Sequence, residues 1–286
     1  MKTIKYFFEF LFIVIFFLIF KIIGYKQSSN LGAFIGKKLG PFFRSNSKIQ
    51  NNLEKSKIGQ SEKEREIIID SMWENYGRIL SEYIYLKQFK KDNFNQFIEI
   101  EGLNYLNDIK KNNEQVIFIS GHFNNFELMA MEIEKAGIDV CAVYRPLNNP
   151  FLNIIMERIR KKYICKNQIK KGKSGTRELV NLFKKNFSIA LMIDQRVSEG
   201  VNIEFFNRLA KTTTIPAQFV KKYKCNIVPV YIERHEKFYF KLSFNKPIKF
   251  NEESNSKEIS LKLNEILEKM ILKHPDQWIW SHDRWK

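Results

Sequence analysis

The sequence predicts an α/β fold in which a mostly parallel central sheet is flanked by helices and preceded by an amino-terminal membrane-anchor helix. From residue 115 onward, short apolar runs typical of buried strands alternate with amphipathic helical segments. The first 26 residues hold the most hydrophobic stretch of the chain. A chain of 286 residues is long enough to bury the core of one large domain or two small ones.

The amino-terminal stretch approaches the length of a membrane span. Residues 6–25 are apolar apart from interruptions such as the charges of Glu9 and Lys21, and about 20 apolar residues cross a bilayer. We therefore assign residues 1–26 to an uncleaved anchor and residues 27–286 to the folded domain. A cleaved signal peptide and a soluble core helix are the alternatives, although no small-x-small cleavage site directly follows the run. Positive charge lies on both sides, so the positive-inside rule leaves the topology open.

The segment between the anchor and residue 115 mixes polar and helical patterns. Residues 27–60 are polar and punctuated by glycine, proline and serine. Ser61 and Glu64 form a capping box that opens a predicted helix over residues 61–86. Residues 97–106 predict a short strand and a turn, and a polar helix end follows.

Beyond residue 115 strands and helices alternate. Gly137 is expected to close the first of these helices, Pro150 to lie in the first turn of the second, and Ser174 to cap the third. The strands between residues 226 and 244 follow one another directly, which predicts an antiparallel or mixed edge. Strands are predicted at 115–120, 138–145, 188–194, 226–234 and 238–244, and helices at 126–137, 149–164, 174–186, 212–224 and 256–278.

The composition points to an anionic partner and a reducing compartment. A net charge of +17 and a pI near 9.6 fit nucleic acid, an anionic bilayer or an acidic protein or substrate. A solubilising surface on a lysine-rich chain is the alternative. The three cysteines lack CxxC spacing, which disfavours a zinc knuckle and a disulfide framework. The four histidines lack metal-ligand spacing, so no metal site is predicted, and no RNP pattern predicts RNA binding.

One histidine stands where catalytic groups collect in α/β folds. His122 follows the predicted strand at 115–120, and Glu127 opens the next helix. On a continuous helix, residues five apart point about 140° from each other, so the two side chains meet only if His122 folds back from the turn. A carboxylate that holds one imidazole nitrogen frees the other to accept a proton. The spacing alone favours the alternative, a solvated loop histidine beside a glutamate that the helix dipole stabilises.

Three further motifs have structural as well as functional interpretations. "IKKGKSGTRE" (169–178) is a Gly- and Lys-rich loop that could contact phosphate, although it lacks P-loop spacing. "AKTTTIPAQF" (210–219) either supplies hydroxyls near a site or caps a helix. "WIWSHDRW" (278–285) is expected to pack in the core rather than at a membrane interface. No G-x-S-x-G motif predicts a serine nucleophile.

"GHFNNFE" (121–127) has the H-x4-D/E form of glycerolipid acyltransferases, and its flanking segments resemble the bacterial lipid A late acyltransferase family of lauroyl and myristoyl transferases. This family is related to mycobacterial phosphatidylinositol mannoside acyltransferases. The resemblance covers nearly the whole chain and implies a glycerolipid-acyltransferase-like fold with an acyltransferase domain at 27–286. The segments that carry it are "VYRPLNNP" (143–150), "GTRELV" (175–180) followed by "ALMIDQ" (190–195), "VNIEFFNRLAKTTTIPAQFVKKYKCNIVPV" (201–230) and "HPDQWIWSHDRWK" (274–286).

The resemblance also implies roles for individual residues. His122 would be the general base on the acceptor hydroxyl, and Glu127 would orient it and balance its charge. Supporting groups of the active site would be Arg160, Asp194 and Arg145. Substrate contacts would come from Tyr144, Arg158, Gln195 and Arg196.

The implied activity is transfer of a fatty acyl chain from an acyl carrier protein thioester to a hydroxyl of a lipid A precursor, without a cofactor or metal. Expected partners are the acyl carrier protein, an anionic membrane and a glycolipid acceptor, but no nucleic acid. Because the carrier is cytosolic, the domain would lie on the cytoplasmic side of the inner membrane. Coenzyme A as donor and a lysophospholipid, aminolipid or phosphatidylinositol mannoside acceptor are alternatives. The alternative from a different functional class is a non-catalytic basic protein that binds at the membrane surface.

Overall fold

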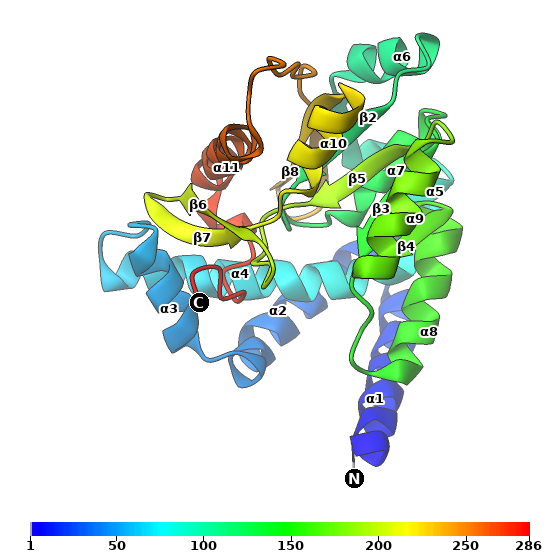
Figure 1. The fold of residues 1–286 in the computed structure, drawn as a ribbon. Helices are drawn as coiled ribbons and strands as arrows, with labels where there is room; N and C mark the ends of the chain where they lie inside the picture. The colour runs from blue at the N-terminus through cyan, green and yellow to red at the C-terminus, as the bar shows by residue number, and fades with distance from the viewer. Residues whose placement is uncertain (1) are drawn as a thin grey trace.

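A computed structural model describes residues 2–286, and a seven-stranded sheet of order β1-β9-β8-β2-β5-β3-β4 lies at its centre. The neighbouring strands are parallel except for the antiparallel pair β8–β9. This confirms the predicted α/β fold and the mixed edge (Figure 1). The strands are β1 (Ile98–Glu101), β2 (Val116–Ser120), β3 (Val140–Tyr144), β4 (Asn167–Lys170), β5 (Ser188–Met192), β8 (Asn226–His235) and β9 (Tyr239–Phe244).

Helices cover both faces of this sheet. Along β2, the side chains of Ile117 and Ile119 enter one buried cluster, while those of Val116 and Phe118 enter another. This alternation is what a strand with two covered faces requires. The helices are α1 (Lys2–Ile23), α2 (Tyr25–Phe43), α3 (Asn46–Lys55), α4 (Glu62–Glu82), α5 (Leu86–Lys90), α6 (Leu103–Lys111), α7 (Glu127–Lys135), α8 (Pro150–Ile159), α9 (Lys173–Phe183), α10 (Ile215–Tyr223) and α11 (Ser256–Lys273).

Several local signals act as the sequence predicts. Ser61 and Glu64 form the capping box that begins α4. Gly137 follows α7 with φ of 78°, a left-handed conformation that glycine adopts without steric cost. Pro150 is the first residue of α8, where its missing N–H is not needed.

The interpretation of residues 27–60 as a polar, punctuated segment is wrong, because α2 and α3 occupy most of it. The glycines are a packing surface: a Cβ at Gly32 would lie 2.4 Å from the carbonyl oxygen of Gly77 in α4, and one at Gly36 would lie 2.2 Å from that of Trp73. Two helix backbones can approach this closely only where side chains are absent. The small residues that indicated loops therefore mark a helix–helix contact.

Three smaller differences between the predicted and the observed elements lie in the middle of the chain. The lysine-rich segment 169–178 contains the end of β4 and the start of α9, and Gly172 rather than Ser174 occupies the N-cap of α9. An antiparallel pair that was not predicted, β6 (Val201–Phe205) and β7 (Arg208–Thr212), forms a separate two-stranded sheet. The predicted helix at 149–164 ends as a π-helical turn over Arg160–Ile164.

Candidate active site

His122 lies at the carboxyl end of β2, beside the end of β5. These strands are parallel with Ser120 opposite Met192, so two residues further on His122 comes level with Asp194. The backbone N–H of His122 donates to Asp194 Oδ2 at 2.8 Å. Strand register alone thus brings together two residues that are 72 positions apart.

The imidazole of His122 is held by Asp194. His122 Nδ1 lies 2.8 Å from Asp194 Oδ1, and the indole N–H of Trp278 donates to Asp194 Oδ2 at 2.8 Å. The Asp194 side chain is 1% exposed, whereas that of His122 is 19% exposed. A buried carboxylate on Nδ1 fixes the imidazole tautomer and leaves Nε2 as the nitrogen available for proton transfer.

The expected contact between His122 and Glu127 is not formed. Glu127 begins α7, and its Oε1 accepts hydrogen bonds from Arg160 Nε at 2.9 Å and Arg160 Nη2 at 2.7 Å. The hydroxyl of Tyr83 donates to the same oxygen. Glu127 therefore belongs to a buried cluster with Arg160 and Tyr83, while Asp194 takes the place on the imidazole that was predicted for Glu127.

The geometry of the loop explains this correction. His122 precedes α7 and turns toward β5, where the strand register places Asp194. Glu127 lies in the first turn of the helix and points instead toward α4 and α8. The ring of Phe126 packs edge-on against the imidazole at 4.8 Å between centroids.

The charges of both carboxylate sites are balanced inside the protein. Burial by itself raises the pKa of Asp194, but the charge and hydrogen bonds of His122 and the Trp278 N–H outweigh it and lower the pKa to about 2. Burial lowers the pKa of Arg160, yet the adjacent Glu127 raises it overall. Burial and Glu127 raise the pKa of Tyr83, which stays a protonated donor. Asp194 and Arg160 are therefore charged, with opposite signs, at neutral pH.

The loop that carries His122 is fixed by its two asparagines. Asn124 adopts a φ of 41°, and its Nδ2 donates to the Ile232 carbonyl at 3.0 Å and to Gln277 Oε1 at 2.6 Å. Asn125 Nδ2 donates to Glu82 Oε2 at 3.2 Å. Asn124 therefore forms the turn, and both asparagines tie the loop to other parts of the chain.

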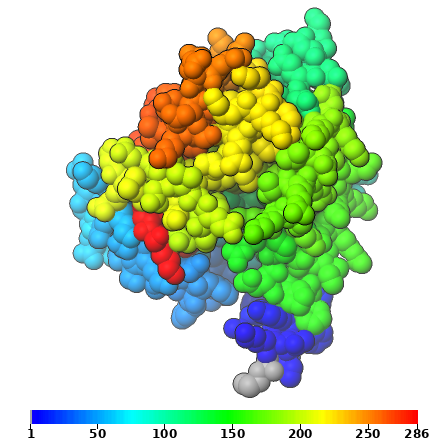
Figure 2. Space-filling view, viewed as in Figure 1, coloured from blue at the N-terminus to red at the C-terminus, as the bar shows by residue number. Residues whose placement is uncertain are grey.

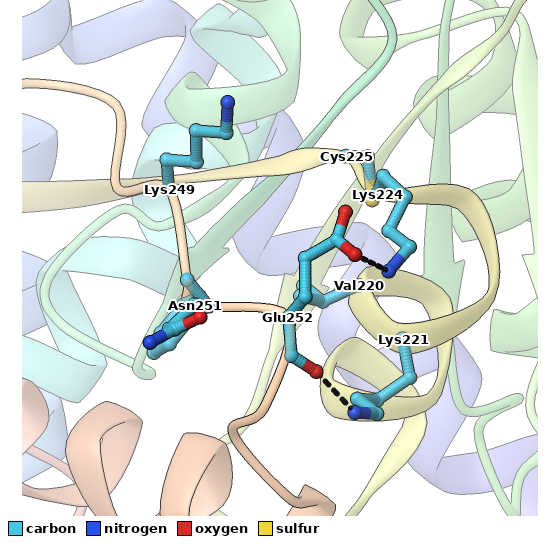
Figure 3. Close-up of a pocket in the computed structure, with 8 residues that line it drawn as sticks. Val220, Lys221, Lys224, Cys225, Lys249, Asn251 and Glu252 are labelled. Carbon is cyan, nitrogen blue, oxygen red and sulfur yellow. Dashed lines mark hydrogen bonds and ion pairs between the residues drawn. The ribbon is translucent and has the colours of Figure 1, made fainter.

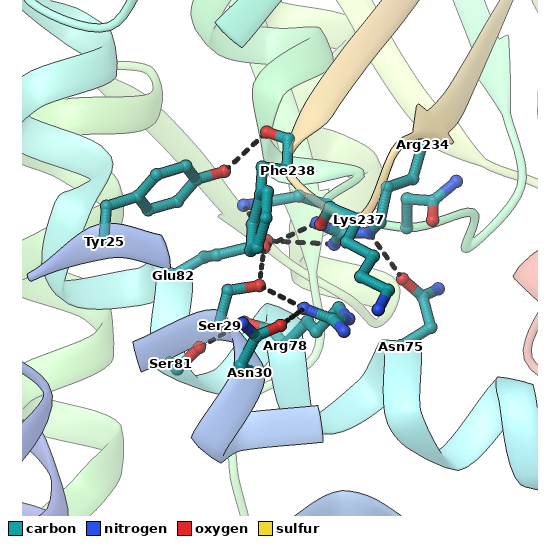
Figure 4. Close-up of polar contacts among 12 residues, drawn as sticks. Tyr25, Ser29, Asn30, Asn75, Arg78, Ser81, Glu82, Arg234, Lys237 and Phe238 are labelled. Atoms are coloured by element: carbon teal, nitrogen blue, oxygen red, sulfur yellow. Dashed lines mark hydrogen bonds and ion pairs between the residues drawn. The ribbon is translucent and has the colours of Figure 1, made fainter. Parts of the chain in front are cut away.

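Glu82 is the centre of a second buried ionic network beside this loop (Figure 4). Arg234 Nη1 lies 2.6 Å from Glu82 Oε1, and Arg234 Nε donates to Asn75 Oδ1 at 3.0 Å. Ser29 of α2 joins the network through Glu82 and Arg78. The network links the anchor-proximal helix α2 to the loop that holds His122.

The carboxy-terminal segment contributes a residue that sequence reasoning missed. Trp278 and Trp280 are buried, which confirms the predicted core packing of residues 278–285. The indole N–H of Trp278 also reaches Asp194, and this contact has no sequence signal beyond the aromatic run. His282 Nε2 accepts from the backbone N–H of Arg196 at 2.9 Å, and burial lowers its pKa to about 4.

The remaining predicted site residues differ in their distance from His122. Gln195 Nε2 lies 3.4 Å from His122 Nε2. Arg196 is half-buried and donates from Nε to the carbonyl of Lys286. Tyr144 borders the Glu127 cluster, because the guanidinium of Arg160 stacks 5.5 Å from its ring centroid. Arg158 and Arg145 are exposed, whereas Arg160 is the buried partner of Glu127.

Two other features lie apart from the site. A small pocket with a volume near 30 Å³, lined by residues including Lys221, Lys224 and Cys225 (Figure 3), lies at the amino end of β8. His122 is at the opposite, carboxyl end of the sheet, so this pocket does not contribute to the site. Within residues 2–286, no group of three or more His, Cys, Asp or Glu side chains is arranged to hold a metal ion.

Comparison with known proteins identifies the family. A sequence model described as "Bacterial lipid A biosynthesis acyltransferase" matches residues 1–286. The chain is 24% identical to the lipid A biosynthesis palmitoleoyltransferase of Escherichia coli over 90% of its own length and 84% of that protein. It is 21% identical to the lipid A biosynthesis myristoyltransferase of Escherichia coli over 88% of its length and 77% of that protein.

A third relative, lipid A biosynthesis acyltransferase 2 of Shigella flexneri, is 23% identical over 77% of this chain and 71% of its own length. The family match spans α1, the His122 loop, β5, Asp194 and the terminal tryptophans. The chain therefore belongs to the bacterial lipid A biosynthesis acyltransferase family and is an acyltransferase.

Proposed function

We propose that this enzyme transfers a fatty acyl chain from an acyl carrier protein thioester to a hydroxyl of a lipid A precursor in lipopolysaccharide biosynthesis. The observation that carries the proposal is the hydrogen bond between Asp194 and His122 Nδ1 at the carboxyl end of the parallel sheet. It directs Nε2 of a partly exposed imidazole outward as a base. The proposed substrate class rests on the family, and the proposed role of His122 as a base rests on its hydrogen bond with Asp194.

The reaction needs one proton acceptor and no covalent enzyme intermediate. His122 Nε2 removes the proton of the acceptor hydroxyl, and the oxygen forms a bond to the thioester carbonyl carbon. The carbon–sulfur bond then breaks, and the departing thiolate takes the proton back from the imidazolium. Asp194 stabilises the imidazolium formed in between, because its carboxylate is charged and buried beside Nδ1. The Gln195 amide lies 3.4 Å from Nε2 and could contact the reacting groups.

The positive charge of the chain suits both substrates. A net charge of +17 attracts an acidic carrier protein and an anionic leaflet through long-range electrostatics. With a cytosolic carrier, the acyltransferase domain works on the cytoplasmic side of the inner membrane. Arg145 and Arg158 are exposed cations on either side of the start of α8, where glycolipid phosphates would meet them.

A transfer assay with purified protein tests this function. Labelled acyl-carrier protein and acyl-coenzyme A serve as donors, and tetra- and penta-acyl lipid A precursors and lysophospholipids serve as acceptors. We expect transfer to a lipid A precursor, faster from the carrier protein. His235→Ala is the matched control, because His235 is an exposed histidine paired with Glu233. Transfer to lysophospholipid alone, or full activity of His122→Ala, contradicts the proposal.

A further inference from the structure

The amino-terminal helix has one uncovered face along its whole length. Its length and composition would let it cross a membrane, and apolar side chains on one side are exposed from the first turn to the last. The exposed members are Ile4, Phe7, Phe8, Leu11, Phe12, Ile15, Leu18, Ile19 and Ile22. Their spacing of three and four residues places them on one helix face. What the opposite face contacts decides how the helix can enter a bilayer.

The opposite face of α1 is docked on the folded domain at both ends. Near the amino end, Asn149 Nδ2 donates to the carbonyl of Tyr6 at 2.8 Å and to Glu9 Oε2 at 3.3 Å. The ring of Phe151 packs 5.8 Å from that of Phe7. At the carboxyl end, Phe20 is 1% exposed. Its carbonyl accepts from the hydroxyls of Tyr85 and Ser28.

This docking is incompatible with a span that leaves the domain on one side of a bilayer. A helix of 22 residues is about 33 Å long, close to the roughly 30 Å of a hydrocarbon core. If α1 crossed, its contact with Asn149 would carry the start of α8 to the far interface, together with the exposed Arg145 and Asn148. Figure 2 shows the amino-terminal part of α1, in blue, projecting below the green atoms at the bottom of the molecule.

Exposed phenylalanines also lie on α2. The glycine side of α2 packs on α4; Phe34, which is 61% exposed, faces away from that side, and Phe42 and Phe43, which are 86% and 81% exposed, lie at the carboxyl end of the helix. The exposed cations Lys38 and Arg44 lie beside them, a pairing that suits anionic headgroups above an apolar layer. In Figure 1 the end of α2, the start of α8 and α1 all lie at the bottom of the molecule, away from α6, α10 and α11.

We propose that the chain is a monotopic membrane protein whose α1 lies inclined in a single leaflet. The exposed face of α1 and the Phe42–Phe43 end of α2 enter the leaflet together, and the amino terminus stays on the same side as the acyltransferase domain. Lys2 and Lys5 reach the headgroups of that leaflet through their long side chains. The lipid bilayer is the occupant proposed for both the exposed face of α1 and the Phe42–Phe43 end of α2.

Cysteine labelling of the full-length chain in sealed membrane vesicles tests the sidedness. The three native cysteines are buried and give a low background. Thr3→Cys reports the amino terminus, and Glu253→Cys reports an exposed position of the domain. With an impermeant maleimide, we expect both variants to be labelled in vesicles of the same orientation and neither in vesicles of the other. Labelling of Thr3→Cys only in the orientation that protects Glu253→Cys shows a span and overturns the proposal.

Depth quenching tests the contribution of α2. A bimane label on Phe42→Cys is compared with one on Leu272→Cys, which is 57% exposed on α11, in vesicles of phosphatidylethanolamine and phosphatidylglycerol with brominated acyl chains. We expect quenching at position 42 and none at position 272. Absence of quenching at 42, or crosslinking of two copies through Phe42→Cys in its place, overturns the bilayer as occupant. Neither readout measures acyl transfer, so both stand apart from the proposed function.

Discussion

The two ends of the loop "GHFNNFE" place a histidine and a glutamate in different environments. His122 pairs with Asp194 and stays partly open to solvent, whereas Glu127 is held by Arg160 and Tyr83 inside the protein. Five residues of sequence thus supply one group that can exchange a proton with a substrate and one that joins a closed ionic cluster. The difference indicates that the motif combines a reactive site with the contacts that hold its loop.

Substitution of His122, the proposed base, is the strongest test of this difference between His122 and Glu127. We expect His122→Ala to lower kcat by about 10² to 10⁴-fold, the usual contribution of a positioned general base. Circular dichroism should show an unchanged fold, because Asp194 keeps its hydrogen bonds from the backbone N–H at position 122 and from the Trp278 indole. The unfolding midpoint should fall, because the buried carboxylate loses its contact with the imidazole. The control His235→Ala should retain full kcat. Equal losses of kcat in both variants would show that His122 takes no part in the chemistry.

Asp194→Asn tests whether Asp194 sets the tautomer of His122. An amide can present its N–H to Nδ1 and stabilise the wrong tautomer, and it cannot balance an imidazolium, so we expect kcat to fall by about 10²-fold or more. The pH profile of kcat/KM should change shape as well, since the base loses its charged partner. An unaltered profile with a small loss of kcat would assign the orienting role elsewhere.

The sequence predicts the alternating core of the fold because burial on both sheet faces leaves apolar runs, as in β2 and β5. It does not predict that Asp194 rather than Glu127 holds His122, because that choice depends on which strands are neighbours and in which register. Trp278 was missed for the same reason. The helix α2 was missed because its glycines serve a close contact with α4 that exists only in the folded chain.

Glu127→Gln tests the buried cluster of Glu127, Arg160 and Tyr83 without changing the pair of His122 and Asp194. The substitution keeps the shape of the side chain but leaves the buried charge of Arg160 unpaired, so we expect the free energy of unfolding to fall by about 3–5 kcal/mol. The pH profile of kcat/KM should keep its shape, measured well below the unfolding temperature. If Glu127→Gln instead lowers kcat as far as Asp194→Asn with unchanged stability, Glu127 acts on the chemistry and the division fails.

Acid stability isolates the contribution of Asp194. Its folded pKa of about 2 lies below the ordinary value near 4, so the group stabilises the fold above pH 4 and this stabilisation disappears as the pH falls toward 2. The difference corresponds to about 2 kcal/mol. Between pH 7 and pH 2.5, the free energy of unfolding measured in urea should therefore fall further for the unmodified protein than for Asp194→Asn. Equal losses would show that Asp194 does not titrate with folding.

The smallest expected effect comes from the hydroxyl that joins the Glu127 cluster. Tyr83→Phe removes a buried donor while Glu127 keeps both hydrogen bonds from Arg160, so the carboxylate stays paired. We expect a loss of about 1 kcal/mol in the free energy of unfolding, the usual net value of one hydrogen bond, with kcat unchanged. A loss as large as that of Glu127→Gln would mean that Tyr83, and not only the ion pair, holds the cluster together. A fall in kcat without a fall in stability would show that the cluster touches the substrate, and the contrast between the two ends of the loop would then no longer hold.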